Sequence, residues 1–228
     1  MLTLYIGNKN YSSWSLRPWL IVKHFDITCS KKIVDVAGRG PSDMHRAYSG
    51  NGLVPCLHLN DFQIWDTLAI AEFLAERYPD KNLWPKDPLS RARARSVCAE
   101  MHSGFGHLRG NMGMNVKLEL EGRPISPEVQ SDIDRIEAIW NQARTDFAPI
   151  TGGDYLFGEF SIADAMFAPV IWRFNSYNVQ LNGPAQEYMQ TMLAHPNMQE
   201  WRLDALAETT AIAHYDENAK KLHGESRV

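Results

Sequence analysis

The chain has 228 residues, of which 44% are hydrophobic and 11% aromatic, so it carries enough apolar side chains for an ordinary globular core. Its net charge of −4 and isoelectric point near 6.1 argue against nucleic acid or an anionic membrane as the main partner. The sequence has no apolar run of the roughly 18 to 20 residues that a membrane span needs, and its first residues lack the pattern of a signal peptide.

Cysteine and histidine are placed in ways that argue against a metal site. Cys29, Cys56 and Cys98 are odd in number and far apart, which fits neither a disulfide framework nor a metal site and suits a reducing compartment. The histidines form no HExxH motif, and His102 and His107 have the wrong spacing for two ligands on one helix face. We therefore expect no metal and a cytoplasmic protein.

Strand and helix patterns alternate over the first 78 residues. Short apolar runs predict four strands, at residues 2–6, within 27–36 (a β-type run at 32–36), at 56–59 and at 62–65. Helical periodicity predicts three helices, at residues 15–24, 44–48 and 67–78. Asn60-Asp61 reads as a two-residue hairpin turn. The order βαβαββα predicts a mixed four-stranded sheet with helices on its faces.

No strand pattern follows the proline-rich linker at residues 81–89, in which Leu83 and Trp84 are expected to pin the two halves together. Helices are predicted at residues 90–108, 126–147, 161–175 and 185–195, and residues 198–210 could add another. The polar residues from 215 onward predict a loose tail. We therefore predict an α/β domain at 1–80 and an all-helical domain at 90–228.

Val54-Pro55 lies just before the strand at 56–59, where a proline removes no ladder hydrogen bond. One interpretation is a plain trans proline at the start of a strand. The other is a cis proline, which turns the preceding backbone outward and leaves the Val54 N–H and C=O free to pair with a peptide-like ligand. The local sequence favours the first, and the surrounding order of strands and helices favours the second.

Asp66-Thr67 opens the helix predicted at 67–78. A helix N-terminus can hold a ligand carboxylate, the threonine hydroxyl adds a donor, and the aspartate can hold an ammonium group. A plain aspartate N-cap explains Asp66 alone equally well. Further on, Ser161 and Asp164 have the spacing of a capping box and receive a structural role only.

Together these elements resemble the glutathione S-transferase family over nearly the whole chain, from LYIGNKNYSSWSLRPW through GNGLVPCLHLNDFQIWDTLAIAEFLAERYP to FGEFSIADAMFAPVIWR. The segment SSWSLR is similar to the Ser-Ser-Cys-Ser-x-Arg motif of zeta-class members, with Trp14 in place of the cysteine. The nearest resemblance is to zeta-like bacterial glutathione transferases. It implies a thioredoxin-like N-terminal domain that binds glutathione, an all-helical C-terminal domain that lines the acceptor pocket, and a homodimer.

The resemblance also implies a set of glutathione-binding residues. A cis proline matches Pro55, and Val54 would pair with the cysteinyl backbone. Asp66 and Thr67 match the pair that holds the γ-glutamyl end, although the family usually has Glu or Gln followed by Ser. Trp14 joins this set, and Arg39 is proposed for the glycine carboxylate, with His45 as the other candidate.

The resemblance places the catalytic hydroxyl on Ser12, five residues before Arg17. Its hydroxyl, together with the N–H groups of Ser13 and Trp14 at the first turn, would donate hydrogen bonds to the glutathione sulfur. Such bonds stabilise a thiolate over a thiol and lower the thiol pKa. Ser13 is a second candidate, and Tyr11 is a third because other classes use tyrosine. Cys56 is predicted to be structural.

The function predicted from these residues is a detoxifying glutathione transferase that activates glutathione as thiolate for addition to small electrophiles. A zeta-type glutathione-dependent cis–trans isomerase is one alternative, which Trp14 disfavours. A non-catalytic binding module of the same fold is another. The stretch at residues 100–115, rich in Met, Gly and His, suits either an adaptable acceptor pocket or a kinked packing helix.

Overall fold

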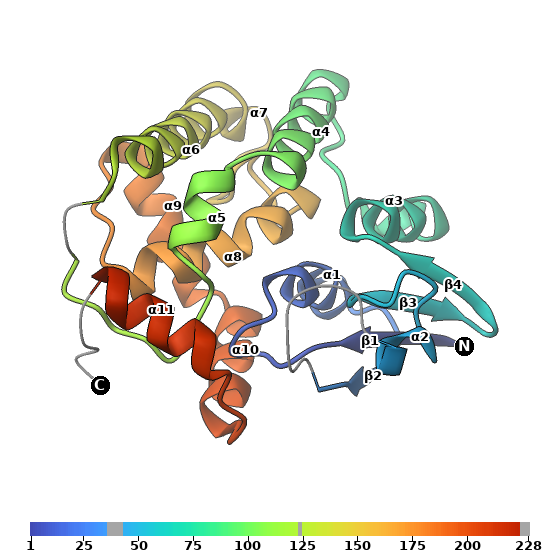
Figure 1. Cartoon of the computed structure of the whole chain (residues 1–228). Coiled ribbons are helices and arrows are strands. Elements are labelled where there is room, and N and C mark those ends of the chain that lie inside the picture. The colour runs from blue at the N-terminus through green and yellow to red at the C-terminus, as the bar shows by residue number, and fades with distance from the viewer. Residues whose placement is uncertain (36–42, 123–124, 224–228) are drawn as a thin grey trace.

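The computed structural model describes residues 1–35, 43–122 and 125–223 (Figure 1). Its strands are β1 (Leu2–Ile6), β2 (Ser30–Ile33), β3 (Cys56–Leu59) and β4 (Phe62–Trp65). The helices up to the middle of the chain are α1 (Ser13–His24), α2 (Asp43–Arg46), α3 (Thr67–Arg77), the short 3-10 helix at Pro79–Lys81, α4 (Pro88–Ser103) and α5 (Gly106–Asn111). The later helices are α6 (Pro127–Asp146), α7 (Ala148–Thr151), α8 (Ile162–Ser176), α9 (Gly183–Ala194), α10 (Pro196–Ala207) and α11 (Ala213–His223).

The strands form one mixed sheet in the order β2-β1-β3-β4. β1 runs parallel to β2 and antiparallel to β3, and β4 is antiparallel to β3. The alternating side chains of Leu2, Leu4 and Ile6 are buried, as expected of a strand with one face on the core. β2 ends at Ile33, so the β-type run predicted at 32–36 extends too far toward the C-terminus.

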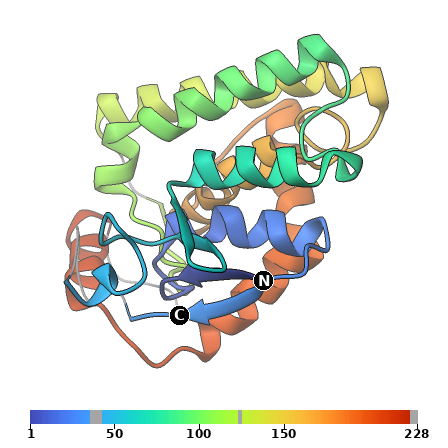
Figure 2. The same ribbon diagram turned by 90° about the vertical axis from the view of Figure 1, so that its right-hand side faces the viewer.

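Helix α1 joins the sheet to the helical part of the chain. It packs on β1 and α3 on one side and on α8 on the other, and Figure 2 shows it between the strands and the later helices. Trp19 and Leu20 of α1 are buried in this contact. α8 is buried around most of its circumference, which makes it the central helix of the C-terminal part.

The start of α8 carries the capping box that the sequence predicts. The Ser161 Oγ accepts from the Ala163 N–H, and the Asp164 carboxylate accepts from the Ser161 N–H at 2.8 Å. Asp164 is fully buried, and burial raises its pKa to about 6. The box therefore has the structural role assigned to it.

The linker contacts both halves of the chain, as predicted. Leu83 is buried, and its carbonyl accepts from the Ile162 N–H at 2.9 Å. Trp84 is also buried, and its indole N–H donates to Glu72 of α3 at 3.2 Å. Residues 1–80 and 90–228 remain our proposed domains, separated by this linker.

Two helix predictions were wrong. The single helix expected at 90–108 is broken into α4 and α5 by Gly104 and Phe105, and Phe105 adopts a left-handed φ of 60°. Residues 215–223 of the tail expected to be loose lie in helix α11 (Figure 1), whose Asp216 accepts a hydrogen bond from the Tyr11 hydroxyl at 3.1 Å. The polar composition of this segment gave no helical pattern from which α11 could be predicted. A short helix that tertiary contacts stabilise needs few apolar residues.

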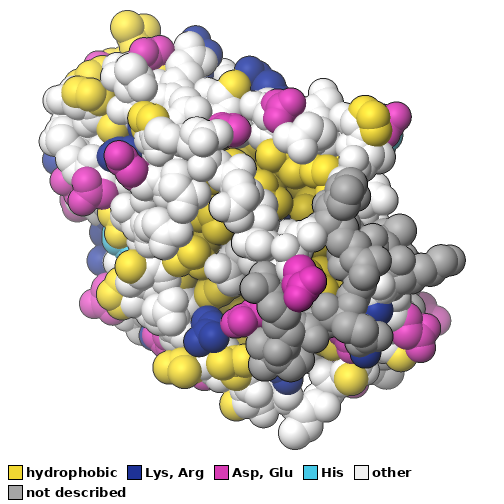
Figure 3. Space-filling model, turned by 90° about the vertical axis from the view of Figure 1, so that its left-hand side faces the viewer, with side chains coloured by type: hydrophobic (Ala, Val, Ile, Leu, Met, Phe, Trp, Pro, Cys, Tyr) yellow, Lys and Arg dark blue, Asp and Glu magenta, His cyan; other side chains and the backbone are white. Residues whose placement is uncertain are grey.

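The surface in Figure 3 mixes acidic, basic and hydrophobic side chains, so neither sign of charge dominates the face that it shows. Within the part of the chain that the structure describes, every helix is too short or too polar to cross a membrane.

Candidate active site

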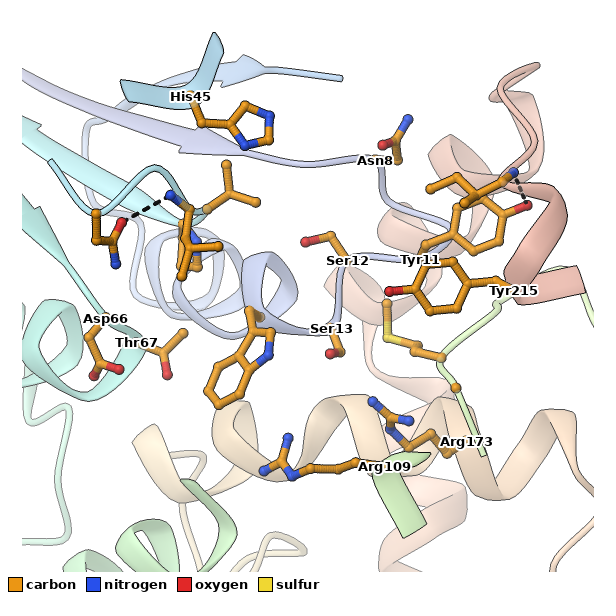
Figure 4. Close-up of a pocket in the computed structure, with 18 residues that line it drawn as sticks. Asn8, Tyr11, Ser12, Ser13, His45, Asp66, Thr67, Arg109, Arg173 and Tyr215 are labelled. Atoms are coloured by element: carbon orange, nitrogen blue, oxygen red, sulfur yellow. Dashed lines mark hydrogen bonds between the residues drawn. The ribbon is translucent and has the colours of Figure 1, made fainter. Parts of the chain in front are cut away.

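A cavity of about 520 Å³ lies between the sheet side and the helical side of the molecule, within the range of small-molecule sites (Figure 4). We call the side built from residues 8–67 the sheet wall and the opposite side the helical wall. The sheet wall consists of Asn8, Tyr11, Ser12, Ser13, Trp14, His45, Asn51, Leu53, Val54, Pro55, Asp66 and Thr67. The helical wall consists of Arg109, Gly113, Met114, Arg173, Ile212 and Tyr215.

Ser12 is the N-cap residue of α1, but its side chain makes no capping hydrogen bond. Its Oγ lies instead 2.7 Å from the Ser15 Oγ, and Figure 4 shows the hydroxyl directed toward the middle of the pocket. The Ser13 hydroxyl points to the side where Arg109 and Arg173 lie. Of these two hydroxyls, Ser12 therefore faces the centre.

The main-chain donors at the start of α1 are only partly available. The Ser13 N–H donates to the Tyr11 carbonyl at 3.0 Å, so it is already paired. The Trp14 N–H has no hydrogen-bond partner among the described residues, as expected in the first turn of a helix. An anion beside Ser12 therefore meets one unpaired main-chain donor at this turn, rather than the two that we expected from the sequence.

Tyr11, the third candidate, is bound to the C-terminal region. Its hydroxyl donates to the Asp216 carboxylate at 3.1 Å and accepts from the Ile212 N–H at 3.3 Å. Burial and the Asp216 charge raise the pKa of Tyr11. The Asn115 side chain also donates to Asp216, at 2.7 Å. Tyr11 thus anchors α11 over the pocket, and its hydroxyl is less available than that of Ser12.

The Val54-Pro55 peptide bond is cis. Val54 lies outside the β3 ladder, which begins at Cys56. Within the described residues neither the N–H nor the C=O of Val54 has a hydrogen-bond partner. Both groups therefore remain able to pair with a peptide-like ligand in the cavity.

Asp66 caps α3, as predicted, with its Oδ1 accepting from the Leu68 N–H at 2.8 Å. Its Oδ2 lies 3.1 Å from His102 Nε2, which brings a residue of α4 to the edge of the site. Burial lowers the pKa of His102. The Thr67 hydroxyl is buried in the wall and has no partner among the described residues, so it can donate to a ligand.

Two guanidinium groups lie close to the Trp14 ring. The Cζ of Arg17 lies 4.3 Å from the centre of the Trp14 ring and that of Arg109 lies 5.1 Å away. Arg17 is buried, and burial with the charges of Arg109 and Arg173 holds its pKa well below its usual range. These neighbouring cations favour an anion in the pocket.

Of the site residues predicted from the sequence, Tyr11, Ser12, Ser13, Trp14, Val54, Pro55, Asp66 and Thr67 line this one cavity. Arg39 lies outside the described residues. His45 also lines the cavity; its Nε2 lies 2.8 Å from the Asp35 carbonyl, and its buried Nδ1 has no partner in the described chain. Cys56 is buried outside the cavity lining, and burial raises its pKa.

Several lining residues were missed by the sequence interpretation. Arg109 and Met114 belong to the stretch at 100–115 and line the cavity. The same stretch contains the break between α4 and α5, and its Met101 and Met112 are buried in the core, so features of both interpretations are present. Arg173, Ile212 and Tyr215 had no signal, because helix packing alone brings them to a pocket formed mainly by the first 67 residues.

Comparisons with known proteins define the family. The family model described as "Glutathione S-transferase, N-terminal domain" matches residues 11–77, and "Glutathione S-transferase, C-terminal domain" matches residues 123–203. Together the two matches span more than half of the chain. The "Probable maleylacetoacetate isomerase" of Caenorhabditis elegans is 27% identical, over 78% of this chain and 81% of that protein. The "Glutathione S-transferase GstB" of Escherichia coli K12 is 28% identical, over 73% of this chain and 74% of that protein.

The fold has solved counterparts. The glutathione transferase homolog from "Burkholderia gl BGR1", solved with bound glutathione, superposes with a TM-score of 0.69 at 22% identity, covering 91% of this chain and 99% of that one. The chain belongs to the glutathione S-transferase family. The comparisons confirm the predicted family, the thioredoxin-like and all-helical fold class, and the prediction of a glutathione S-transferase enzyme.

Proposed function

We propose that this protein binds glutathione on the sheet wall, holds it as a thiolate beside Ser12, and adds it to small electrophiles on the helical wall. One observation carries the proposal: Ser12, the unpaired Val54 backbone and the Asp66-Thr67 pair meet on one wall of one cavity. The arrangement of these three groups along a single wall suits an extended tripeptide whose sulfur lies at the start of α1.

Each part of glutathione has a proposed partner. The γ-glutamyl ammonium binds the Asp66 carboxylate, and its carboxylate accepts from the Thr67 hydroxyl at the N-terminus of α3. The cysteinyl backbone pairs with the N–H and C=O of Val54. Arg39 is our proposal for the glycine carboxylate, with His45 as the other candidate.

The Ser12 hydroxyl donates to the sulfur, and the Trp14 N–H adds a second donor. Hydrogen bonds to a charged sulfur stabilise thiolate over thiol, and the guanidinium groups around Trp14 act in the same direction. A fall of about two units in the thiol pKa requires roughly 2.7 kcal/mol, which one charge-assisted bond and a helix N-terminus can supply.

The thiol proton passes to water, and the thiolate attacks the electrophilic carbon of the acceptor. With an aryl halide, a carbon–sulfur bond forms, the carbon–halogen bond breaks, and the halide leaves with the electron pair of that bond. The products are a thioether of glutathione, a halide ion and a proton taken up by solvent.

Turnover of a chromogenic aryl halide with glutathione tests the proposal. Loss of one charge-assisted hydrogen bond in Ser12→Ala lowers kcat/KM by about 10- to 100-fold. Ser90→Ala, which removes a buried hydroxyl at the start of α4, leaves it unchanged. Undiminished turnover in Ser12→Ala contradicts the role of Ser12. If calorimetry detects no binding of glutathione at millimolar concentration, the result favours the non-catalytic module instead.

The isomerase alternative has its own assay. The Caenorhabditis elegans relative is named "Probable maleylacetoacetate isomerase". Trp14 stands where the zeta-class motif that this chain resembles has cysteine. We expect little isomerisation of maleylacetoacetate by the wild type. We also propose a cytoplasmic homodimer with a detoxifying role, and sedimentation velocity tests its oligomeric state.

A further inference from the structure

Ser15 lies one turn of α1 beyond Ser12 and belongs to no predicted set of site residues. It is fully buried, with an exposed fraction of 0%. Its Oγ accepts from the Gly7 N–H at 2.9 Å and lies 2.7 Å from the Ser12 Oγ. These two groups are its side-chain partners within the described residues.

Among the described residues, the Ser12 Oγ is the one acceptor within reach of the Ser15 hydroxyl hydrogen. A serine hydroxyl carries one hydrogen and two lone pairs, and Gly7 can only donate to it. If Ser12 donated to Ser15, the buried Ser15 hydrogen would have no acceptor, which buried polar groups rarely tolerate. The Ser12 hydrogen has no such problem, because Ser12 lines the cavity. The arrangement that satisfies both residues has Ser15 donating to Ser12.

We propose that Ser15 is a positioning residue that fixes the Ser12 hydroxyl with its hydrogen directed at the glutathione sulfur; this rests on the proposed function. The Gly7 N–H donates to Ser15, Ser15 donates to Ser12, and Ser12 donates to the sulfur. All three bonds point the same way, so each polarises the next and strengthens the last.

The two ends of this chain are held by rigid elements. Gly7 directly follows β1, one of the two inner strands of the sheet, and Ser15 is in the first turn of α1. The Ser12 hydroxyl is therefore oriented before glutathione binds, which reduces the cost of ordering the donor at the sulfur. Burial of Ser15 excludes water that would compete for its hydrogen.

A purely structural role for Ser15 makes a different prediction. A serine that only accepts the Gly7 N–H would affect the folding stability of the protein and leave the ionisation of bound glutathione alone. The pKa of the bound thiol therefore separates the two roles.

The test is a pH titration of the thiolate absorbance of glutathione bound to wild type, Ser12→Ala, Ser15→Ala and the double variant. Loss of one hydrogen bond in the chain raises the bound thiol pKa in Ser15→Ala by about 0.5 to 1 unit. The double variant has the same thiol pKa as Ser12→Ala, because Ser15 acts through Ser12. Ser90→Ala, the matched loss of a buried hydroxyl, retains the wild-type value.

An unchanged thiol pKa in folded Ser15→Ala overturns the inference, and so does a rise in the double variant beyond that of Ser12→Ala. If Ser15→Ala does not fold, Ser15→Cys keeps the size of the side chain with a weaker donor. Its thiol pKa is expected to rise too, and no rise overturns the inference. A wild type that leaves the glutathione thiol at its solution pKa contradicts the proposed function itself, before Ser15 is considered.

Discussion

The sheet wall and the helical wall of the pocket differ in how their polar groups are paired. On the sheet wall, the Thr67 hydroxyl and the Val54 backbone have no hydrogen-bond partner among the described residues. On the helical wall, Arg109 donates to the main-chain carbonyls of Gly104 and Met101, and Arg173 donates to that of Met112. The sheet wall can therefore bind a polar ligand through direct bonds, whereas the helical wall mainly provides charge and shape.

This difference indicates that the two walls bind different ligands, the sheet wall glutathione and the helical wall the acceptor. A substitution on the sheet wall should change the affinity for glutathione, because it removes a bond to that one molecule. A substitution on the helical wall should change the KM of the acceptor and leave glutathione binding almost intact. The predictions below test that division, starting with the largest expected effect.

Asp66→Asn should weaken glutathione binding by about 10- to 100-fold, because it removes the charge that holds the γ-glutamyl ammonium. Asparagine caps helices as well as aspartate does, so the stability of the protein should change little. Asp87→Asn is the matched control, since Asp87 caps α4 by accepting from the Ser90 N–H at 2.7 Å. Isothermal titration calorimetry measures both, and equal loss of affinity in the two variants contradicts the assignment.

Thr67→Val should weaken glutathione binding by about 10-fold, through the loss of one hydrogen bond to the charged γ-glutamyl carboxylate. Because the Thr67 hydroxyl is buried without a partner among the described residues, the free protein should be as stable as wild type or more stable. Calorimetry and thermal unfolding together check this prediction. A destabilised variant with unchanged affinity would show that the hydroxyl serves the fold rather than the ligand.

Tyr11 lies on the sheet wall, but its hydroxyl holds α11 of the helical wall through Asp216. Tyr11→Phe should therefore raise the KM of the acceptor by about 2- to 4-fold, because it frees α11 from this anchor. The pKa of the bound glutathione thiol should not move. Tyr48→Phe, which removes a hydroxyl that is buried without a partner in the described chain, is the control and should change neither value. A rise in the thiol pKa as large as that of Ser12→Ala would make Tyr11 the donor.

The N-terminal and C-terminal halves of the chain also meet away from the pocket, where the Nδ1 of His24 in α1 lies 2.9 Å from the Nε2 of His195 at the start of α10. Burial and the neighbouring His195 lower the pKa of His24 from 6.5 to about 4. Between these values the unfolded chain binds a proton that the folded chain does not, so stability falls as pH decreases from 6.5 toward 4.

Asp164 contributes to the pH dependence of stability with the opposite sign, because its raised pKa of about 6 makes the folded state bind more protons below that pH.

His24→Phe isolates the contribution of the histidine, since it preserves the stacking on Phe160, whose ring centre is 3.9 Å away. Chemical denaturation across pH 4 to 6.5 should show the variant losing less stability on acidification than wild type. Parallel curves for the two proteins would rule out this role of His24.

Most of the sheet wall could be predicted because its signals are local. Asp66 precedes an apolar helical pattern, Pro55 precedes a strand, and Ser12 opens a helix, so each residue is defined by its immediate neighbours. The break between α4 and α5 also left a local signal in Gly104, where a Cβ would lie 2.8 Å from the Glu100 carbonyl oxygen. The helical pattern on both sides of Gly104 outweighed this single residue in the prediction of one helix at 90–108.

The helical wall could not be predicted in the same way. Ile212 and Tyr215 reach the pocket through contacts with Tyr11, about two hundred residues earlier in the chain. Such contacts depend on how α8, α10 and α11 pack, and hydrophobic periodicity does not encode that packing. Ser15 could not be identified for another reason: the role that we propose for it depends on the groups beside its hydroxyl, Gly7 and Ser12, and no sequence pattern encodes that arrangement.

The crystal structure of this protein with glutathione bound tests the central claim most directly. We predict that the sulfur lies within hydrogen-bond distance of the Ser12 Oγ, with the γ-glutamyl group at Asp66 and Thr67. A sulfur whose nearest hydroxyl is that of Tyr11 or Ser13, or a glutathione molecule bound away from the sheet wall, would contradict it.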